Sequence, residues 1–356
     1  MLREWIQILR GLGINRALFD QLEIHGMTVE QGSFLYPIIA TAAQNGQSSI
    51  AYAKLLYFDS ACAEWVRRDL LPVSTLGLLC TLGIVQDKAS ALAAEIIAGG
   101  LLGAVFTAME RIPEKKNQKT PDLQLGPAQF AEVYCPQESL TESTKYAAWL
   151  AEAVGPINLF VSHPITGSSP LAMQYTANVV IDRAVSGKRD KNQFEEGAEN
   201  ILWLDLLHGF GINGHDTKPF TSVHKGENTY VGSFGIWHSL YGAKGCSFAS
   251  ERTDLRYFEG RTVYKQQRPG LFRERPEASA AVLLVSDGVL LFENPWTSTP
   301  LSEKTRQSLK RMLRFKPDLS YLAISGQNLE ARINGILAEI EWLFTITQEA
   351  EQALEE

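Results

Sequence analysis

One short segment of the chain concentrates the residue types that most often carry acid–base and metal chemistry. Four of the six histidines, His208, His215, His224 and His238, lie within 31 residues. Asp205 precedes His208 by three positions, a spacing that places two side chains on the same side of a helix. Imidazole and carboxylate groups are the usual general acids and bases near neutral pH. The segment therefore predicts an active site with Asp205, His208, His224 and His238 as its catalytic residues.

The same segment leaves two other interpretations open. The first is a metal site, because Asp216, Glu227 and Cys246 add further metal-ligating side chains, although no HExxH or HxH spacing identifies a particular metal or cofactor. The histidines could instead be polar loop residues and helix caps, and His238, beside Trp237, could belong to a packed aromatic cluster.

A second pattern is a concentration of positive charge. Between Glu251 and Lys316 there are 13 Lys and Arg against eight Asp and Glu, a local charge of +5 in a chain of net charge −7. Aromatic residues such as Tyr257 and Tyr264 are interleaved with the arginines, and guanidinium groups bind phosphates while aromatic rings stack on bases. The pattern predicts a surface for nucleic acid or another phosphate-bearing ligand, although the same arginines could pair with nearby acids or cover a sheet. The predicted phosphate-binding residues are Arg256, Arg261, Lys265, Arg268, Arg273, Lys310, Arg311 and Arg314.

Several specific motifs are missing. Residues 162–170 (SHPITGSSP) lack the lysine and glycine spacing of a P-loop, and residues 209–214 (GFGING) follow a predicted helix instead of a strand. The sequence contains no GxSxG, and Val263 stands where a D…(E/Q)xK nuclease pattern would need an acid before Lys265. No named enzyme class follows from motifs alone.

The elements around these residues change character along the chain. Residues 1–111 show helical spacing of apolar residues without strand-like alternation, which predicts an all-α domain. Residues 112–127 contain three prolines and three lysines and are typical of a linker. Residues 128–356 mix helical and strand patterns, with helices predicted over 141–153, 170–183 and 193–208 and a short buried strand over 157–162.

Two hairpins are predicted in this second part, one over 255–264 with a Glu-Gly turn and one over 281–293 with an Asp-Gly turn. A further strand is expected within 320–325 and a helix from about residue 328 to the end. The fold class that follows is an all-α N-terminal domain and then an α+β domain with a mainly antiparallel sheet.

Composition limits the function classes. The chain has 356 residues, 45% of them hydrophobic and 21% charged, which is typical of a globular protein with room for two domains. The four cysteines are widely spaced and form no CxxC pair, which favours reduced thiols and a cytoplasmic location. The uncharged stretches 70–86 and 96–109 are shorter than the ~20 residues of a membrane span, so we expect no stable membrane insertion.

Three functional hypotheses remain. The first is a cytoplasmic protein that binds nucleic acid or a phosphorylated ligand within a larger complex, with its helical domain contacting a protein partner. The second is a hydrolytic enzyme, with a nuclease as one candidate, that uses the His/Asp segment 205–238. The third is a non-catalytic structural subunit. Salt dependence of binding distinguishes the first from the third, and dependence of an activity on the histidines distinguishes the second.

Overall fold

The computed structural model describes most of the chain. The described residues are 1–113, 120–136, 193–210, 220–225, 228–233, 235–244, 247–252, 261–265, 268–286, 288–312, 323–324 and 328–338. The helix predicted over 141–153, the strand over 157–162 and the helix over 170–183 lie outside them.

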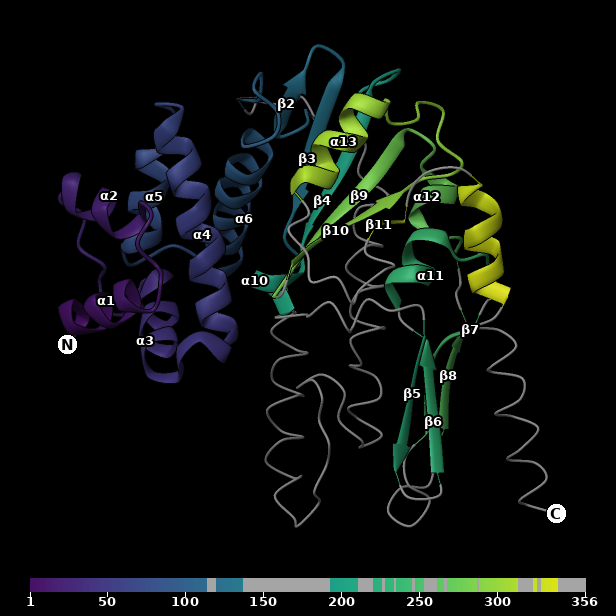
Figure 1. Cartoon of the computed structure of the whole chain (residues 1–356), viewed down its shortest axis with the longest axis horizontal. Helices are drawn as coiled ribbons and strands as arrows, with labels where there is room; N and C mark the ends of the chain where they lie inside the picture. Colours follow the sequence, from purple (N-terminus) through teal and green to yellow (C-terminus); the bar gives the residue numbers. More distant parts are fainter. Residues whose placement is uncertain are drawn as a thin grey trace.

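The N-terminal region is helical, as predicted, and lies beside a central sheet (Figure 1). Its helices are α1 (Leu2–Gly11), α2 (Leu18–Ile24), α3 (Leu35–Asn45), η1 (Gly46–Ser48), α4 (Ile50–Arg67), α5 (Val73–Cys80) and α6 (Gln86–Gly103).

Helices α4 and α6 form the centre of this region because small residues let them approach closely. Gly99 faces the indole ring of Trp65, whose Nε1 donates a 2.8 Å hydrogen bond to the carbonyl oxygen of Ile96. Both uncharged stretches belong to this packing, since Leu76 and Leu79 of α5 and Ile97 and Leu102 of α6 are buried. In the part of the chain that the structure describes, no helix is long and apolar enough to cross a membrane.

The second part is built on a seven-stranded mixed sheet, so the predicted mainly antiparallel sheet is wrong. The strand order is β1-β2-β3-β4-β9-β10-β11, and β3–β4, β4–β9 and β10–β11 are parallel pairs. Parallel central strands are covered on both faces and are joined by long crossovers, so their sequences show continuous apolar runs without the short turns that mark antiparallel neighbours. The strands are β1 (Glu110–Arg111), β2 (Leu123–Gly126), β3 (Gln129–Tyr134), β4 (Glu199–Asp205), β9 (Ala278–Val285), β10 (Gly288–Glu293) and β11 (Ala323–Ile324).

The predicted helix over 193–208 is also wrong, because residues 199–205 form β4. The run Ile-Leu-Trp-Leu is buried on both faces of the sheet, and a short apolar run of this kind has no periodicity that separates strand from helix. In addition, β2 lies within the segment 112–127 that has the composition of a linker.

The hairpin over 281–293 is confirmed as the antiparallel pair β9–β10, with Gly288 opposite Val285. The first strand and the turn of the other predicted hairpin, over 255–264, lie outside the described residues. Its second strand is β8 (Arg261–Lys265), which in the described part of the chain pairs with β7 (Ser247–Arg252). Strands β5 (Phe220–Lys225) and β6 (Asn228–Ser233) form another two-stranded sheet.

Two hydrophobic layers cover the large sheet. On one face, alternate residues such as Val133, Trp203 and Val282 share a single core with the N-terminal helices and with α13 (Glu303–Met312). On the other face, Leu204 and Leu283 pack with the remaining helices. These helices are α11 (Gly235–Tyr241), α12 (Leu271–Glu274) and the helical residues 329–338, which lie on the right of the sheet in Figure 1.

Candidate functional site

The candidate site lies at one edge of the central sheet. Strands β3, β4 and β9 are parallel, so their carboxyl ends, at Tyr134, Asp205 and Val285, meet at the same edge. This is the edge at which open α/β sheets bind their ligands. The short helix α10 (Leu206–Phe210) begins there, directly after β4 (Figure 1).

Asp205 ends β4 and fixes the start of α10. Its Oδ1 accepts hydrogen bonds from the backbone N–H groups of Leu207 and His208, at 3.1 and 2.9 Å. A carboxylate in this position satisfies the unpaired N–H groups of a first helical turn. The apolar strand therefore ends at the residue whose side chain starts the next element.

The second carboxylate oxygen of Asp205 binds the imidazole of His208. The distance from Oδ2 to Nδ1 is 2.8 Å. The exposed fraction of the side chain is 0% for Asp205 and 2% for His208. A carboxylate beside Nδ1 orients the ring and keeps the proton of the neutral imidazole on Nδ1. Nε2 is then the basic atom. This is the arrangement by which a carboxylate orients a histidine base.

A lysine from the N-terminal region completes this cluster. Lys54 of α4 is half-buried, and its Nζ donates a 3.3 Å hydrogen bond to the carbonyl oxygen of His208. Burial lowers the pKa of Lys54 from its ordinary value, and this effect outweighs the opposing attraction of Asp205 and Cys135. The edge of the sheet thus holds a buried acid–histidine pair with an amino group beside it.

The sequence pattern predicts Asp205 and His208 but not Lys54, and the predicted reason for the Asp205–His208 contact is wrong. The two residues meet because an aspartate caps the turn that carries the histidine, whereas the prediction placed both on one helix. Lys54 does leave a sequence signal, because it is the only charged residue in the apolar run 50–58.

The other two predicted catalytic histidines lie in different elements. His224 is in β5, opposite Thr229 of β6, and His238 is in α11. Their side chains fall outside the described part of the structure. Among the described residues, no group of three His, Cys, Asp or Glu side chains could hold a metal ion.

The predicted phosphate-binding residues separate into groups. Arg268 forms a two-point ion pair with Glu274, at 3.0 and 2.9 Å. The Arg273 guanidinium lies 3.8 Å from the centre of the Trp296 ring, and its Nε donates to the carbonyl oxygen of Tyr241 at 2.7 Å. Both arginines therefore make contacts within the fold. Arg256 and Arg314 lie outside the described residues, and only the backbone of Arg261 and Lys265, in β8, is described.

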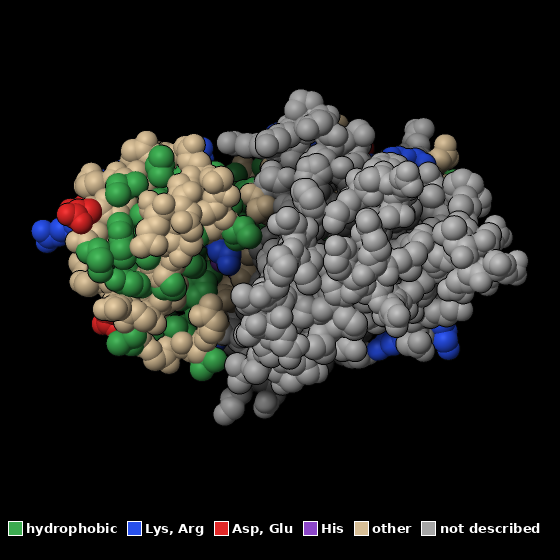
Figure 2. All heavy atoms as spheres, turned by 90° about the horizontal axis from the view of Figure 1, so that it is seen from below, with side chains coloured by type: hydrophobic (Ala, Val, Ile, Leu, Met, Phe, Trp, Pro, Cys, Tyr) green, Lys and Arg blue, Asp and Glu red, His purple; other side chains and the backbone are tan. Residues whose placement is uncertain are grey.

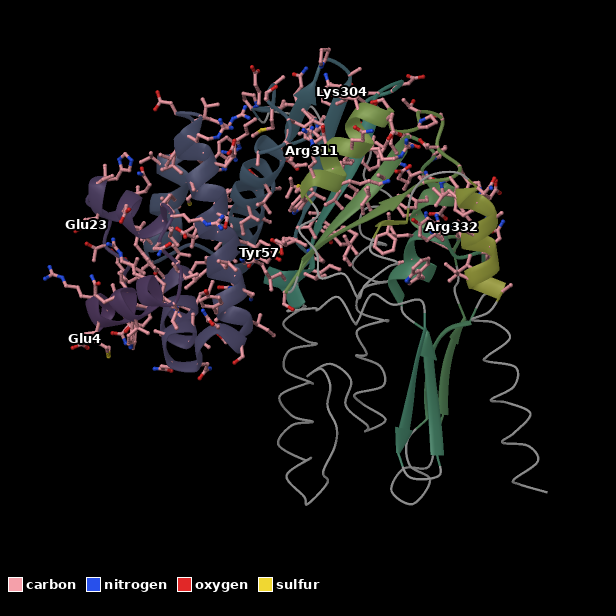
Figure 3. All side chains as sticks on the ribbon, viewed as in Figure 1. Glu4, Glu23, Tyr57, Lys304, Arg311 and Arg332 are labelled. Atoms are coloured by element: carbon pink, nitrogen blue, oxygen red, sulfur yellow. The ribbon has the colours of Figure 1, made fainter. Side chains whose placement is uncertain are left out.

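Helix α13 retains an exposed basic face. Its apolar side, including Leu309 and Met312, packs on the sheet, and Lys304, Lys310 and Arg311 are exposed on the other side. The positions of Lys304 and Arg311 can be followed in Figure 3. The acidic residue of α13, Glu303, is exposed and pairs with Arg306 at 2.6 Å. The outer surface of the helix therefore keeps a positive charge.

A hollow of about 610 Å³ lies between the end of β10, α13 and the helical residues 329–338. Glu293 and Arg306 line it and bind each other at 2.7 and 3.0 Å, and this carboxylate raises the pKa of Arg306. The remaining charged side chain of the lining, Glu330, accepts a 2.9 Å hydrogen bond from the indole N–H of Trp296.

The protein has a helical N-terminal region and a mixed sheet that is covered on both faces. At the carboxyl ends of the parallel strands it holds a buried Asp205–His208 pair with the half-buried Lys54 beside it. Comparisons with protein-family models, with curated proteins and with solved structures gave no match for the chain.

Proposed function

We propose that this protein is a hydrolase whose acid–base pair is Asp205 and His208. The observation that carries the proposal is the 2.8 Å contact between Asp205 Oδ2 and His208 Nδ1 in a buried environment. The location at the carboxyl edge of three parallel strands, where ligands of open α/β sheets bind, supports the same proposal.

Each side chain has a distinct role in this proposal. Asp205 orients the ring and stabilises the imidazolium that forms when His208 takes up a proton at Nε2. The ammonium of Lys54 stabilises negative charge that develops on the substrate, an effect that is stronger where water is excluded. Hydrolysis then needs only a nucleophile and a substrate group that can enter at this edge.

The test is hydrolysis of p-nitrophenyl acetate and p-nitrophenyl phosphate by the full chain and its variants. His208→Gln and Asp205→Asn should each reduce the rate by at least about 100-fold, the usual contribution of a general acid–base group. His25→Gln is the matched control because His25 is exposed at the end of α2. Unchanged rates in both site variants, with melting temperatures equal to that of the parent, would reject the proposal.

A second candidate function is binding of nucleic acid or another phosphate-bearing ligand. The specific observation in its favour is the exposed cationic face of α13, formed by Lys304, Lys310 and Arg311. It takes second place because Arg268 and Arg273, which the sequence assigns to the same surface, are already engaged within the fold. Helix α13 begins at the amino ends of β3 and β4, where Gln129 donates to Thr305 and the N–H of Ser302 donates to Glu199, so its basic face would be a surface separate from the Asp205–His208 pair.

A protein partner and a reducing compartment complete the proposal. The helical region exposes large apolar side chains, among them Ile24, Leu82 and Val85, which are 60–69% exposed. Figure 2 shows one face of this region, and hydrophobic side chains are visible on it. Exposed apolar groups of this kind support a protein contact.

Cys62 and Cys80 are buried and form no disulfide, which supports a cytoplasmic location.

A further inference from the structure

A cysteine lies beside the acid–base pair. Cys135 directly follows β3, and the register that pairs Tyr134 with Leu204 places Cys135 next to Asp205 on the neighbouring parallel strand. Adjacent strands are ~4.8 Å apart, so the next residues after this pair, Cys135 on one chain segment and Asp205 on the other, are also neighbours. Cys135 shares the sheet face of Val133 and Trp203, and alternation along β4 assigns Asp205 to that face as well.

The same cysteine interacts electrostatically with Lys54. Burial lowers the pKa of Lys54, and Asp205 and Cys135 oppose that effect, while Lys54 Nζ donates to the carbonyl oxygen of His208 in the turn that follows Asp205. A neighbouring ammonium favours the thiolate form of a cysteine, which is the nucleophilic form, and here it acts against the opposite effect of the adjacent Asp205 carboxylate. Three elements, α4, β3 and β4, thus bring an amino group, a thiol and an acid–histidine pair to one edge of the sheet.

The other described cysteines lie inside the helical region, away from this cluster. All three described thiols are buried, with exposed fractions of 0% for Cys62, 1% for Cys80 and 7% for Cys135. Burial raises the pKa of the Cys62 and Cys80 thiols, to about 12 for Cys80. They are therefore internal controls for any reagent that requires a thiolate.

We propose that Cys135 is the nucleophile of this site and that the substrate is an acyl compound, an ester or an amide. The proposal rests on the proposed hydrolase function and names its reaction class. A thiolate with an oriented histidine is the usual combination for acyl transfer through a covalent intermediate.

The reaction proceeds in two balanced steps. The Cys135 Sγ thiolate attacks the acyl carbon, a carbon–sulfur bond forms, and the bond to the alcohol or amine breaks while protonated His208 gives that leaving group its proton. Water then attacks the thioester, His208 accepts a proton from the water, and the carbon–sulfur bond breaks to release the carboxylic acid and the thiolate. No oxidant or other co-reactant is required.

The test is alkylation of the native full chain with iodoacetamide, with each cysteine followed by peptide mass spectrometry. Cys135 should react faster than Cys62 and Cys80. In Lys54→Met the reaction at Cys135 should be about tenfold slower, because the charge that favours the thiolate is gone. A Cys135 rate no higher than those of Cys62 and Cys80, or equal in the parent and Lys54→Met, would overturn the proposal.

A second measurement separates this proposal from the proposed function. Hydrolysis of p-nitrophenyl acetate should be lost in Cys135→Ala as well as in His208→Gln. If Cys135→Ala keeps the parent rate while His208→Gln loses it, the nucleophile is wrong and the acid–base pair stands. If His208→Gln also keeps the parent rate, the hydrolase proposal itself is wrong. The alkylation result does not depend on which substrate is tested.

Discussion

Gly100 of α6 lies directly against Ala61 of α4, so that a Cβ atom on Gly100 would come within 2.5 Å of the Ala61 Cα and 2.6 Å of its carbonyl oxygen. These are backbone atoms, which cannot move aside as the end of a flexible side chain can. The contact fixes how closely the two longest helices of the N-terminal region approach each other.

Gly100→Ala should therefore destabilise the protein although alanine favours helix formation. We expect a loss of about 1–3 kcal/mol in the free energy of unfolding, the usual cost of overpacking. Urea denaturation measures it. Gly11→Ala is the control, because no atom of the described residues lies within 4 Å of a Cβ at that position of α1, and it should leave stability unchanged or raise it by up to ~1 kcal/mol. Equal effects of the two substitutions would contradict this account of the helix contact.

Asp59→Ala should also destabilise the helical region. The buried Asp59 carboxylate accepts hydrogen bonds from the backbone N–H groups of Arg16, Ala17 and Leu18, at 2.9, 2.8 and 2.7 Å, and so holds the start of α2. Loss of such a charged cap, which leaves buried donors unpaired, should cost about 2–3 kcal/mol by urea denaturation. Asp20→Ala, which removes an exposed ion pair with Arg10, should cost less than about 1 kcal/mol. A cost for Asp59→Ala as small as that of Asp20→Ala would show that Asp59 does not hold α2.

The Cys80 thiol should make stability fall at alkaline pH. Burial raises its pKa from 9.0 to about 12, so the contribution is complete below 9 and is lost as the pH rises toward 12, because the unfolded chain releases its proton first. The difference in free energy of unfolding between the parent and Cys80→Ala should therefore shrink over this interval. For Leu79→Ala, which truncates a buried residue that does not titrate, the difference should stay constant. Parallel pH profiles for the parent and Cys80→Ala would count against this assignment.

The basic face of α13 should bind phosphate-bearing polymers in a salt-dependent way. Fluorescence anisotropy with single- and double-stranded oligonucleotides should show weak sequence discrimination and an affinity that falls as salt rises. Each of Lys304→Gln, Lys310→Gln and Arg311→Gln should lower the slope of log K against log salt by roughly 0.7–0.9 for a lost phosphate contact. Arg3→Gln on α1 is a control with the same change of charge on an exposed residue. If all four variants bind as the parent does, Lys310 and Arg311 serve only the negative end of the helix dipole.

Local patterns in the sequence were sufficient for several parts of this protein. Helical spacing of apolar residues predicts the N-terminal helices, because one buried stripe per helix repeats every three to four positions. The hairpin β9–β10 is likewise predicted locally, since two apolar runs joined by Asp-Gly have few alternatives to antiparallel pairing. Their residue types also mark Asp205 and His208 as candidates, although a cap and not a shared helix brings the two together.

Only the tertiary structure decided the order and direction of the central strands. Strands β3, β4 and β9 pair in parallel across long separations in sequence, and nothing within each strand encodes its neighbour. The same physical reason applies to Lys54, which lies 154 positions from His208 in the chain but reaches its carbonyl oxygen. Such contacts depend on how α4 packs against the edge of the sheet, whereas the sequence determines only that Lys54 is a charge within an apolar stretch.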